Sequence, residues 1–490
     1  MYLSSGIPEP KGARHQPWWP HVTPTQLRRI RTRLTAFAED LFASIPRKDQ
    51  RRWGQTYLRG LLLDGKRKSI QPMAARLTRG DPQADAYALE QALQQFVNQS
   101  PWDPTSVRRR LTQRITAALR PAAWVIDDTA FPKYGRHSVG VARQYCGTLG
   151  KVANCQVGVS IHAATDQASC PLDWRLFLPP EWDDDLARRR TAHVPDHERH
   201  RPKWQLALEL LDELAAWGLA APVLLADAAY GEVSEFRLGL EQRDLAYVVQ
   251  VPATLSAYVE DVAPKLVPYT GRGRPPVPRY RQPRSSLRAL VLAAGKRAAR
   301  TVAWREGADR QPLGSRFVAL RVRPAGVRLR RATHGGQLPV RWLLAEWPAG
   351  EPEPVAYWLA SLPADTPLQQ LVHLAKLRWA SRARLPRAEG RVGAGPLRGA
   401  LVAGLASPRD AGVGRACIRD LGAAGPKSPC VGLTTFAYCV SCNSWSPVGP
   451  ARVRCACVDS HGRRHGCTPQ LRRPNGVQVP GCAQTLAADG

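Results

Sequence analysis

The spacing of apolar residues along the chain changes character once, close to Pro121. Between residues 25 and 118 apolar side chains recur every three or four positions, which predicts a series of amphipathic helices. After Pro121 the pattern changes to short apolar or alternating runs at 123–127, 137–147 and 154–164. Such runs predict strands, and the turn-like segment between the last two predicts a hairpin.

Four further elements follow in alternation. Helical spacing returns over 203–217 and 233–242, while apolar runs at 222–231 and 246–253 predict strands. The acidic, Pro-containing segment before the first of these helices is expected to be a loop. The resulting order, strand-strand-strand-helix-strand-helix-strand, is that of a ribonuclease-H-like sheet. The expected fold class is therefore α/β, with a ribonuclease-H-like core.

An acidic residue ends both the first and the fourth strand of this order. Asp127 closes the run at 123–127, and Asp227 lies within the run at 222–231. These two strands are neighbours in a ribonuclease-H-like sheet, so we expect the two carboxylates to converge. Carboxylate oxygens are preferred by hard divalent cations, and two such ions about 3.5–4 Å apart can activate water and stabilise a leaving phosphodiester oxygen. One acid at a strand end is more often a cap or turn residue, but two at these positions predict a metal site.

The charge of the chain indicates a polyanionic partner. The 490 residues include 70 Lys and Arg against 40 Asp and Glu, a net charge of +30. Nucleic acid is the simplest partner for such a charge, although a solvated Arg-rich surface would give the same total. The helical region 25–118 carries many of these basic residues. It is expected either to grip DNA phosphates or to be an ordinary helical bundle with a charged face.

Basic residues are densest between residues 265 and 331, where 18 Lys and Arg stand against only two acids. A basic, Pro-rich stretch at 270–284 opens this segment, and the apolar runs behind it predict strands. Tyrosine and tryptophan residues are interleaved with the charges. We therefore expect a basic β-rich insertion that binds DNA phosphates, with the candidate DNA-binding residues Arg272, Arg274, Arg279, Arg281 and Arg284.

The remaining composition bears on where the protein works. No apolar run is long enough to cross a membrane, and the first twenty residues contain no signal-peptide segment. We therefore expect a cytoplasmic, nucleoid-associated protein without a membrane partner, in which Cys146 and Cys155 are reduced core residues. Eight of the 11 Cys lie after position 400, where their spacing suggests either zinc ligation or chance.

Three stretches carry a specific resemblance. These are WVIDDTAFPKYGRHSVGVARQYCGTLGKVANCQVGVSIH at 124–162, LFLPPEWDDD at 176–185 and LLADAAYGEVSEF at 224–236. Together they resemble DDE-type transposases of insertion-sequence family 701, and the resemblance covers roughly residues 25–379. It implies an enzyme that cuts transposon ends and joins them to target DNA with Mg²⁺, with Mn²⁺ as the alternative ion. Its DNA partners would be the terminal repeats and the target, with a homo-oligomer on DNA left open.

The resemblance also implies residue roles and a domain division. In the D-x-T arrangement usual for these enzymes, the first catalytic and metal-binding acid is Asp127, with Asp128 its close rival, and the second is Asp227. The implied parts are a DNA-contacting helical region at 1–118, a catalytic core at 119–262, the basic insertion at 263–345, a return to the core at 346–380 and a tail at 381–490.

The third catalytic acid of the family is missing from its expected place. It should be a Glu on a helix after 371–380, within a stretch like Tyr-x-x-Leu-Lys-x-Glu-Leu-Gly, but the sequence there is rich in Gly and Pro and offers only Glu389. Back-translating 385–405 with a shift of one base yields Tyr-Arg-Glu-Leu-Lys-Asp-Glu-Leu-Gly. We therefore interpret everything after about residue 380 as an out-of-frame, disordered tail. The expected product is a catalytically crippled transposase; the alternative is a non-catalytic DNA-binding pseudo-transposase that could inhibit an intact copy.

Overall fold

The computed structural model describes residues 23–384, with gaps at 64–67, 266–267, 270, 273–278, 307–310 and 334–335, and two short strands at 456–458 and 464–466. The chain divides into two compact units, Met1–Pro447 and Val448–Gly490. In the second unit, β13 (Ala456–Val458) pairs antiparallel with β14 (Arg464–Gly466). The rest of the expected out-of-frame tail, with the zinc-like spacing of its cysteines, lies outside the described residues.

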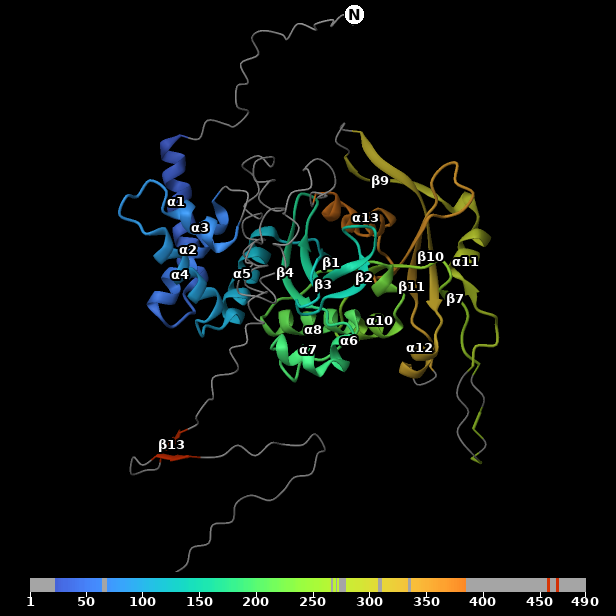
Figure 1. Cartoon of the computed structure of the whole chain (residues 1–490). Helices are drawn as coiled ribbons and strands as arrows, with labels where there is room; N and C mark the ends of the chain where they lie inside the picture. Colours follow the sequence, from blue (N-terminus) through green and yellow to red (C-terminus); the bar gives the residue numbers. More distant parts are fainter. Residues whose placement is uncertain are drawn as a thin grey trace, which may run out of the picture. The chain divides into compact units, whose positions relative to one another are not determined.

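The first part of the chain is helical, which confirms the prediction from the apolar spacing (Figure 1). Thr23 and Gln26 form a capping box that satisfies two backbone N–H groups at the first helix. The apolar stripes of these helices pack together and bury Phe42, Leu58 and Phe96, because packing of one apolar face supplies most of a helix's stability. The bounds are α1 (Pro24–Phe42), α2 (Lys48–Leu62), α3 (Ile70–Leu77), α4 (Ala86–Asn98) and α5 (Pro104–Leu119).

The core sheet has the pairing expected of a ribonuclease-H-like fold. Strand β1 pairs antiparallel with β3 on one side and parallel with β5 on the other, and β5 pairs parallel with β6. Strand β3 pairs along its far side with β2 and then with β4, both antiparallel. The bounds are β1 (Ala123–Pro132), β2 (Ala142–Cys146), β3 (Lys151–Ala164), β4 (Ser169–Leu176), β5 (Leu224–Ala226) and β6 (Tyr247–Val251).

The sequence pattern missed one strand of this sheet, overextended two and ended one too early. Strand β4 lies in the segment that was expected to be a loop, and β2 begins at Ala142 rather than at 137. Strand β5 covers only Leu224–Ala226 of the run at 222–231, and β1 continues to Pro132, so that Asp127 lies within β1 rather than at its end. The pattern of β4 does not alternate, because Pro171 and Asp173 are buried along with its apolar residues. Cys146 and Cys155, on β2 and β3, are buried core residues as predicted.

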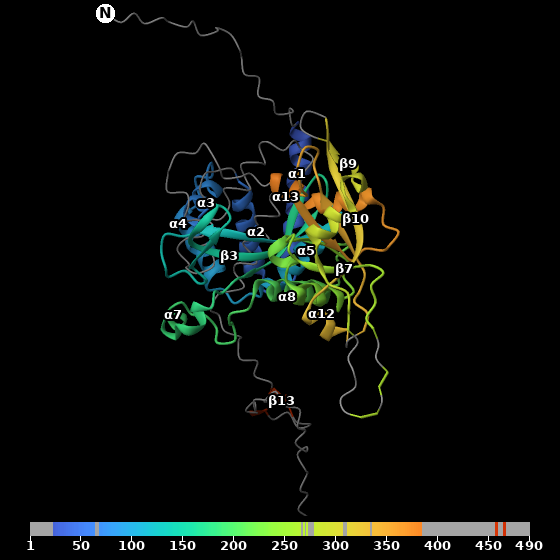
Figure 2. The same ribbon diagram turned by 90° about the vertical axis from the view of Figure 1, so that its right-hand side faces the viewer.

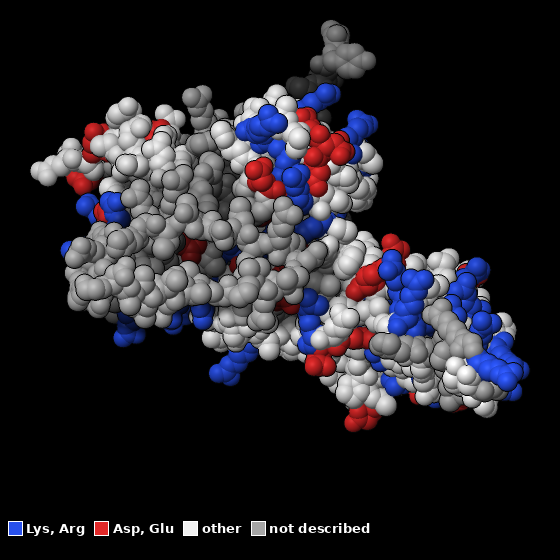
Figure 3. Space-filling view, turned by 90° about the horizontal axis from the view of Figure 1, so that it is seen from below, with Lys and Arg blue, Asp and Glu red and all other residues white. Residues whose placement is uncertain are grey.

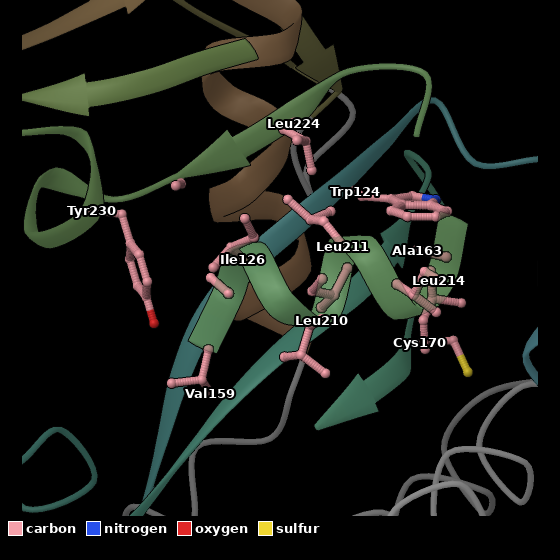
Figure 4. Close-up of a cluster of buried hydrophobic side chains, with 14 of the residues drawn as sticks. Trp124, Ile126, Val159, Ala163, Cys170, Leu210, Leu211, Leu214, Leu224 and Tyr230 are labelled. Atoms are coloured by element: carbon pink, nitrogen blue, oxygen red, sulfur yellow. The ribbon is translucent and has the colours of Figure 1, made fainter. Parts of the chain in front are cut away.

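Helices cover both faces of the sheet. Because successive strand residues face opposite sides, Trp124 and Ile126 of β1 pack with the leucines of α8 (Figure 4), while Ala123 and Val125 pack in a second cluster with the leucines of α13. Helices α8 and α13 therefore lie on opposite faces of the sheet (Figure 2), and the small helices α6 and α7 precede α8 along the chain. The bounds are α6 (Glu181–Asp184), α7 (Leu186–Thr191), α8 (Lys203–Ala216), α9 (Ala228–Gly231), α10 (Ser234–Glu241) and α13 (Leu368–Arg384).

The basic segment contains strands, which confirms the β-rich character predicted for it, and these strands continue the core sheet. Strand β12 pairs antiparallel with β6, and the order then runs β12-β11-β10-β7-β8, with β9 also paired to β10. The domain limits proposed from the sequence stay a prediction. The bounds are β7 (Ser256–Val259), β8 (Ser285–Ser286), α11 (Leu287–Ala294), the short 3₁₀ helix η1 (Lys296–Ala298), β9 (Arg300–Glu306), β10 (Pro312–Pro324), α12 (Val327–Ala332), β11 (Arg341–Glu346) and β12 (Ala356–Ala360). Among the described residues, no helix combines the length and apolarity that crossing a membrane requires.

Candidate active site

Strand alternation places the two predicted acids on the same face of the sheet. Asp127 follows Val125 by two residues on β1, and Asp227 follows Leu225 by two at the end of β5. Val125 and Leu225 both belong to the cluster that packs against α13. Because β1 and β5 are adjacent and parallel, the carboxylates of Asp127 and Asp227 emerge side by side beneath that helix.

An arginine of α13 lies between these carboxylates. The Arg378 Nη2 donates to Asp227 Oδ2 at 3.0 Å and lies 3.7 Å from Asp127 Oδ1. The exposed side-chain fractions are 5% for Arg378, 14% for Asp127 and 26% for Asp227. Two acids therefore share one buried guanidinium, and their opposite charges compensate for the hydration that burial removes.

Backbone and hydroxyl groups hold the two acids in place. The Asp128 N–H donates to Asp127 Oδ1 at 2.9 Å, and the Ser160 hydroxyl donates to the Asp127 carbonyl at 3.0 Å. Asp227 caps the short helix α9, where its Oδ1 accepts from the Ala229 N–H at 3.1 Å. Each carboxylate is therefore oriented by a backbone N–H group before any ligand binds.

Asp128, the rival to Asp127, points to the other face of the sheet. The Lys203 Nζ of α8 lies 2.6 Å from Asp128 Oδ2, and the Tyr230 hydroxyl donates to Asp128 Oδ1. Burial and the neighbouring Asp128 carboxylate raise the pKa of Tyr230 well above its ordinary value, so this hydroxyl stays protonated and keeps donating. The side chain of Asp128 is therefore committed to a polar network that includes α8.

His162 lies on β3 opposite Val125 of β1, and it is buried and neutral. Its Nε2 is 3.1 Å from the Ser160 hydroxyl, and its ring packs edge-on against Trp174. Burial lowers the pKa of His162 to about 4, against a smaller opposing effect of Asp127. A neutral, hydrogen-bonded ring indicates a structural role for this histidine.

Comparisons with known proteins identify the family of the chain. Residues 40–311, more than half of the chain, match the family described as DDE superfamily endonuclease. The chain belongs to this family. It is also 30% identical over 204 residues to a protein of Microchaete diplosiphon described as a probable transposase for insertion sequence element IS701. That match covers 41% of this chain and 48% of the relative, so the chain spans about half the length of the relative.

DDE superfamily endonucleases generally use divalent metal ions, and the donor set here fits such an ion in part. Asp127 and Asp227 provide the oxygen ligands that these ions prefer. Within the ranges that the structure describes, no group of three or more His, Cys, Asp and Glu side chains could hold a metal ion. The side chains of 379–384 and Glu389, the one Glu after residue 380, lie outside these ranges.

Three residues of this candidate site escaped the sequence interpretation: Arg378, Lys203 and Tyr230. Arg378 had a signal, because it continues the buried stripe of α13 that includes Leu371 and Leu374. An arginine on a buried helical stripe needs an anionic partner. Lys203 and Tyr230 carried no comparable signal, since both lie at helix ends where polar residues are common.

Of the five predicted DNA-binding arginines, Arg274 lies outside the described residues, and the other four lie in the described part of the basic segment. Arg272, Arg279, Arg281 and Arg284 are all exposed. Tyr280 anchors two of them, because its ring stacks on Tyr258 at 4.5 Å and its hydroxyl accepts from the Leu338 N–H at 2.7 Å. Lys and Arg side chains gather at the right-hand end of Figure 3, and further exposed arginines of the insertion are Arg328, Arg330 and Arg331 on α12.

Proposed function

We propose that the chain derives from a transposase that cuts transposon ends and joins them to target DNA, with Asp127 and Asp227 as its catalytic acids. The observation that carries this proposal is the convergence of both carboxylates on one face, at neighbouring parallel strands. Family membership and the IS701-like relative support the reaction class. Asp128 receives a positioning role instead, because Lys203 and Tyr230 hold its carboxylate on the opposite face.

The two acids would hold the divalent cations, Mg²⁺ or alternatively Mn²⁺. When bound, such ions supply Lewis-acid activation of water and of the scissile phosphate. The chain's own contribution is preorganisation: the Asp128 N–H orients the carboxylate of Asp127, and the Ala229 N–H orients that of Asp227. Exposed arginines of the insertion would contact DNA phosphates, which fixes position without reading the base sequence.

We further propose that this particular chain is catalytically impaired. Two carboxylates alone bind divalent ions weakly, and the acid expected on α13 after residue 380 has no counterpart in the sequence there. The competing proposal is a non-catalytic DNA-binding protein that occupies transposon ends and inhibits an intact copy. The buried Arg378 between the acids favours it, because its positive charge lies next to both carboxylates, where a cation would be needed.

A cleavage and binding assay separates these proposals. The full chain is incubated with Mg²⁺ or Mn²⁺ and duplex DNA that carries the terminal repeats of its own element, beside the Asp227→Asn variant. We expect binding without cleavage above the level of Asp227→Asn. Replacing Arg279 and Arg281 by Ala should weaken binding and reduce its log–log salt slope by about 2. Robust cutting that disappears in Asp227→Asn would support the transposase and contradict impairment. Absence of DNA binding would contradict both proposals.

We also propose that an out-of-frame reading produced the segment after about residue 380. The test is the coding DNA itself. If the shifted frame does not encode Tyr-Arg-Glu-Leu-Lys at the corresponding position, this proposal is wrong. Whether any such change is a mutation or a programmed event is a separate matter that the same DNA, compared with an intact relative, would address.

A further inference from the structure

Arg378 is placed so that it and a divalent cation would compete for the same two carboxylates. A single guanidinium nitrogen, Nη2, lies within 3.0 Å of Asp227 and 3.7 Å of Asp127. An ion that bridges these two acids would have to occupy the space next to that nitrogen. Both the volume of the guanidinium and its positive charge oppose this, and the low exposure of the site leaves little solvent to screen the repulsion.

The charges also explain why Arg378 lies there. Two carboxylates that emerge side by side repel each other and need a cation. A buried guanidinium, in turn, needs anionic partners. In the absence of a metal ion each group satisfies the other, so the arginine does for the acid pair what a bound cation would do.

Helix α13 has a separate anchor, so Arg378 can leave without moving the helix. Two residues earlier, the Lys376 Nζ lies 2.5 Å from Glu346 Oε2 and over the rings of Trp304, Phe317 and Trp358, at 4.7, 5.6 and 5.6 Å from their centroids. This contact ties α13 to β9, β10, β11 and β12. Release of Arg378 therefore requires a rotation of one side chain rather than a shift of the element that carries it.

We propose that Arg378 is a built-in counter-ion that holds the Asp127–Asp227 pair in the metal-free protein and must withdraw before a divalent cation can bind. The inference rests on the proposed assignment of these two acids as the metal site. It goes further, because it predicts that metal affinity is limited by a residue of the chain itself. The relevant readout is metal binding, which requires neither DNA nor cleavage.

The test is Mn²⁺ binding to the full chain after metal removal, measured from the free-ion signal in electron paramagnetic resonance. We expect Arg378→Gln to bind Mn²⁺ about tenfold more tightly than the unmodified chain, which corresponds to about 1.4 kcal/mol. Arg378→Lys keeps a positive charge on a shorter, narrower head group and should fall between the two. Adding Asp227→Asn to Arg378→Gln should abolish the gain, because the ion then lacks one of its two carboxylates.

Equal or weaker binding by Arg378→Gln would overturn the inference, as would a gain that survives Asp227→Asn. If Arg378→Gln is destabilised, thermal unfolding with and without Mn²⁺ provides a second measurement. Mn²⁺ should then raise the unfolding temperature of Arg378→Gln more than that of the unmodified chain, and equal shifts would contradict the competition. Failure here leaves the DNA cleavage assay unaffected, so the two proposals can fail independently.

Discussion

We expect Asp173→Asn to destabilise the fold strongly, because it removes the main compensation of a buried positive charge. The Arg108 Nε and Nη2 donate to the two oxygens of Asp173 at 3.1 and 2.6 Å. The exposed side-chain fractions are 3% for Arg108 and 0% for Asp173. This bidentate pair joins α5 to β4, and the same Nη2 lies 3.2 Å from Glu213 of α8. The interaction therefore connects the last helix of the N-terminal region to the core sheet.

The expected loss of unfolding free energy depends on how well the buried charge of Arg108 is still compensated after the substitution. Removing one partner of a buried ion pair costs about 3–5 kcal/mol, because the other charge stays desolvated. Asn keeps the shape and one acceptor, and Glu213 stays close to Arg108, so we expect a loss near the lower limit, about 3 kcal/mol. Burial of Arg108 opposes its charge, but Asp173 and Glu213 raise its pKa above the ordinary value. The variant loses the effect of Asp173, but a guanidinium keeps its proton in proteins, so Arg108 does not escape the penalty by losing that proton.

Urea unfolding followed by tryptophan fluorescence measures this loss. The matched control is Asp49→Asn, which removes an acid from an ion pair of similar length, 2.7 Å, whose Asp49 side chain is 51% exposed. We expect no measurable change for the control, since exposed pairs contribute little. Replacing both Arg108 and Asp173 by Met and Leu should recover much of the stability, because no buried charge is then left alone. If Asp173→Asn has the same free energy of unfolding as the control, the reasoning is refuted.

Two further predictions concern the site and its supporting helix. Burial lowers the pKa of His162 to about 4 from an ordinary 6.5. As the pH falls, the unfolded chain therefore takes up a proton at this histidine before the folded chain does. The stability that depends on His162 is complete above pH 6.5 and is lost as the pH drops toward 4. The total is about 3 kcal/mol, and His162→Gln should show a flatter loss of stability in urea unfolding between pH 7 and 4; an unchanged pH profile would contradict this. Lys376→Met should destabilise the fold by about 3 kcal/mol, because it leaves Glu346 buried without its cation. Lys376→Met with Glu346→Gln should recover most of this loss in the same assay, and no recovery would show that the aromatic contacts, not the ion pair, dominate.

The limits of sequence reasoning are clearest at β4. Strands β1 and β3 were predicted because their apolar pattern is local and regular. The pattern of β4 is interrupted by Asp173, which a local reading assigns to a loop since acids are rarely buried. Only its partner makes the burial possible, and Arg108 lies 65 residues earlier in the chain. A period-based prediction has no access to an ion pair formed across that separation.

The candidate site divides along the same line between local and long-range information. Strand alternation alone puts Asp127 on the face of Val125 and Asp128 on the other, so a choice between the rivals requires knowing which face holds the site. The face that we propose for the site is covered by α13, which packs on β5 and β6 after an intervening segment of more than a hundred residues. The sequence shows that Arg378, on a buried stripe, needs an acid, and that two converging acids need a cation. It does not show that Arg378 pairs with these two acids, because that contact depends on how α13 packs on the sheet. A site predicted from sequence is therefore least complete where buried charged residues have no partner nearby in the sequence. At such positions the fold decides which opposite charges meet.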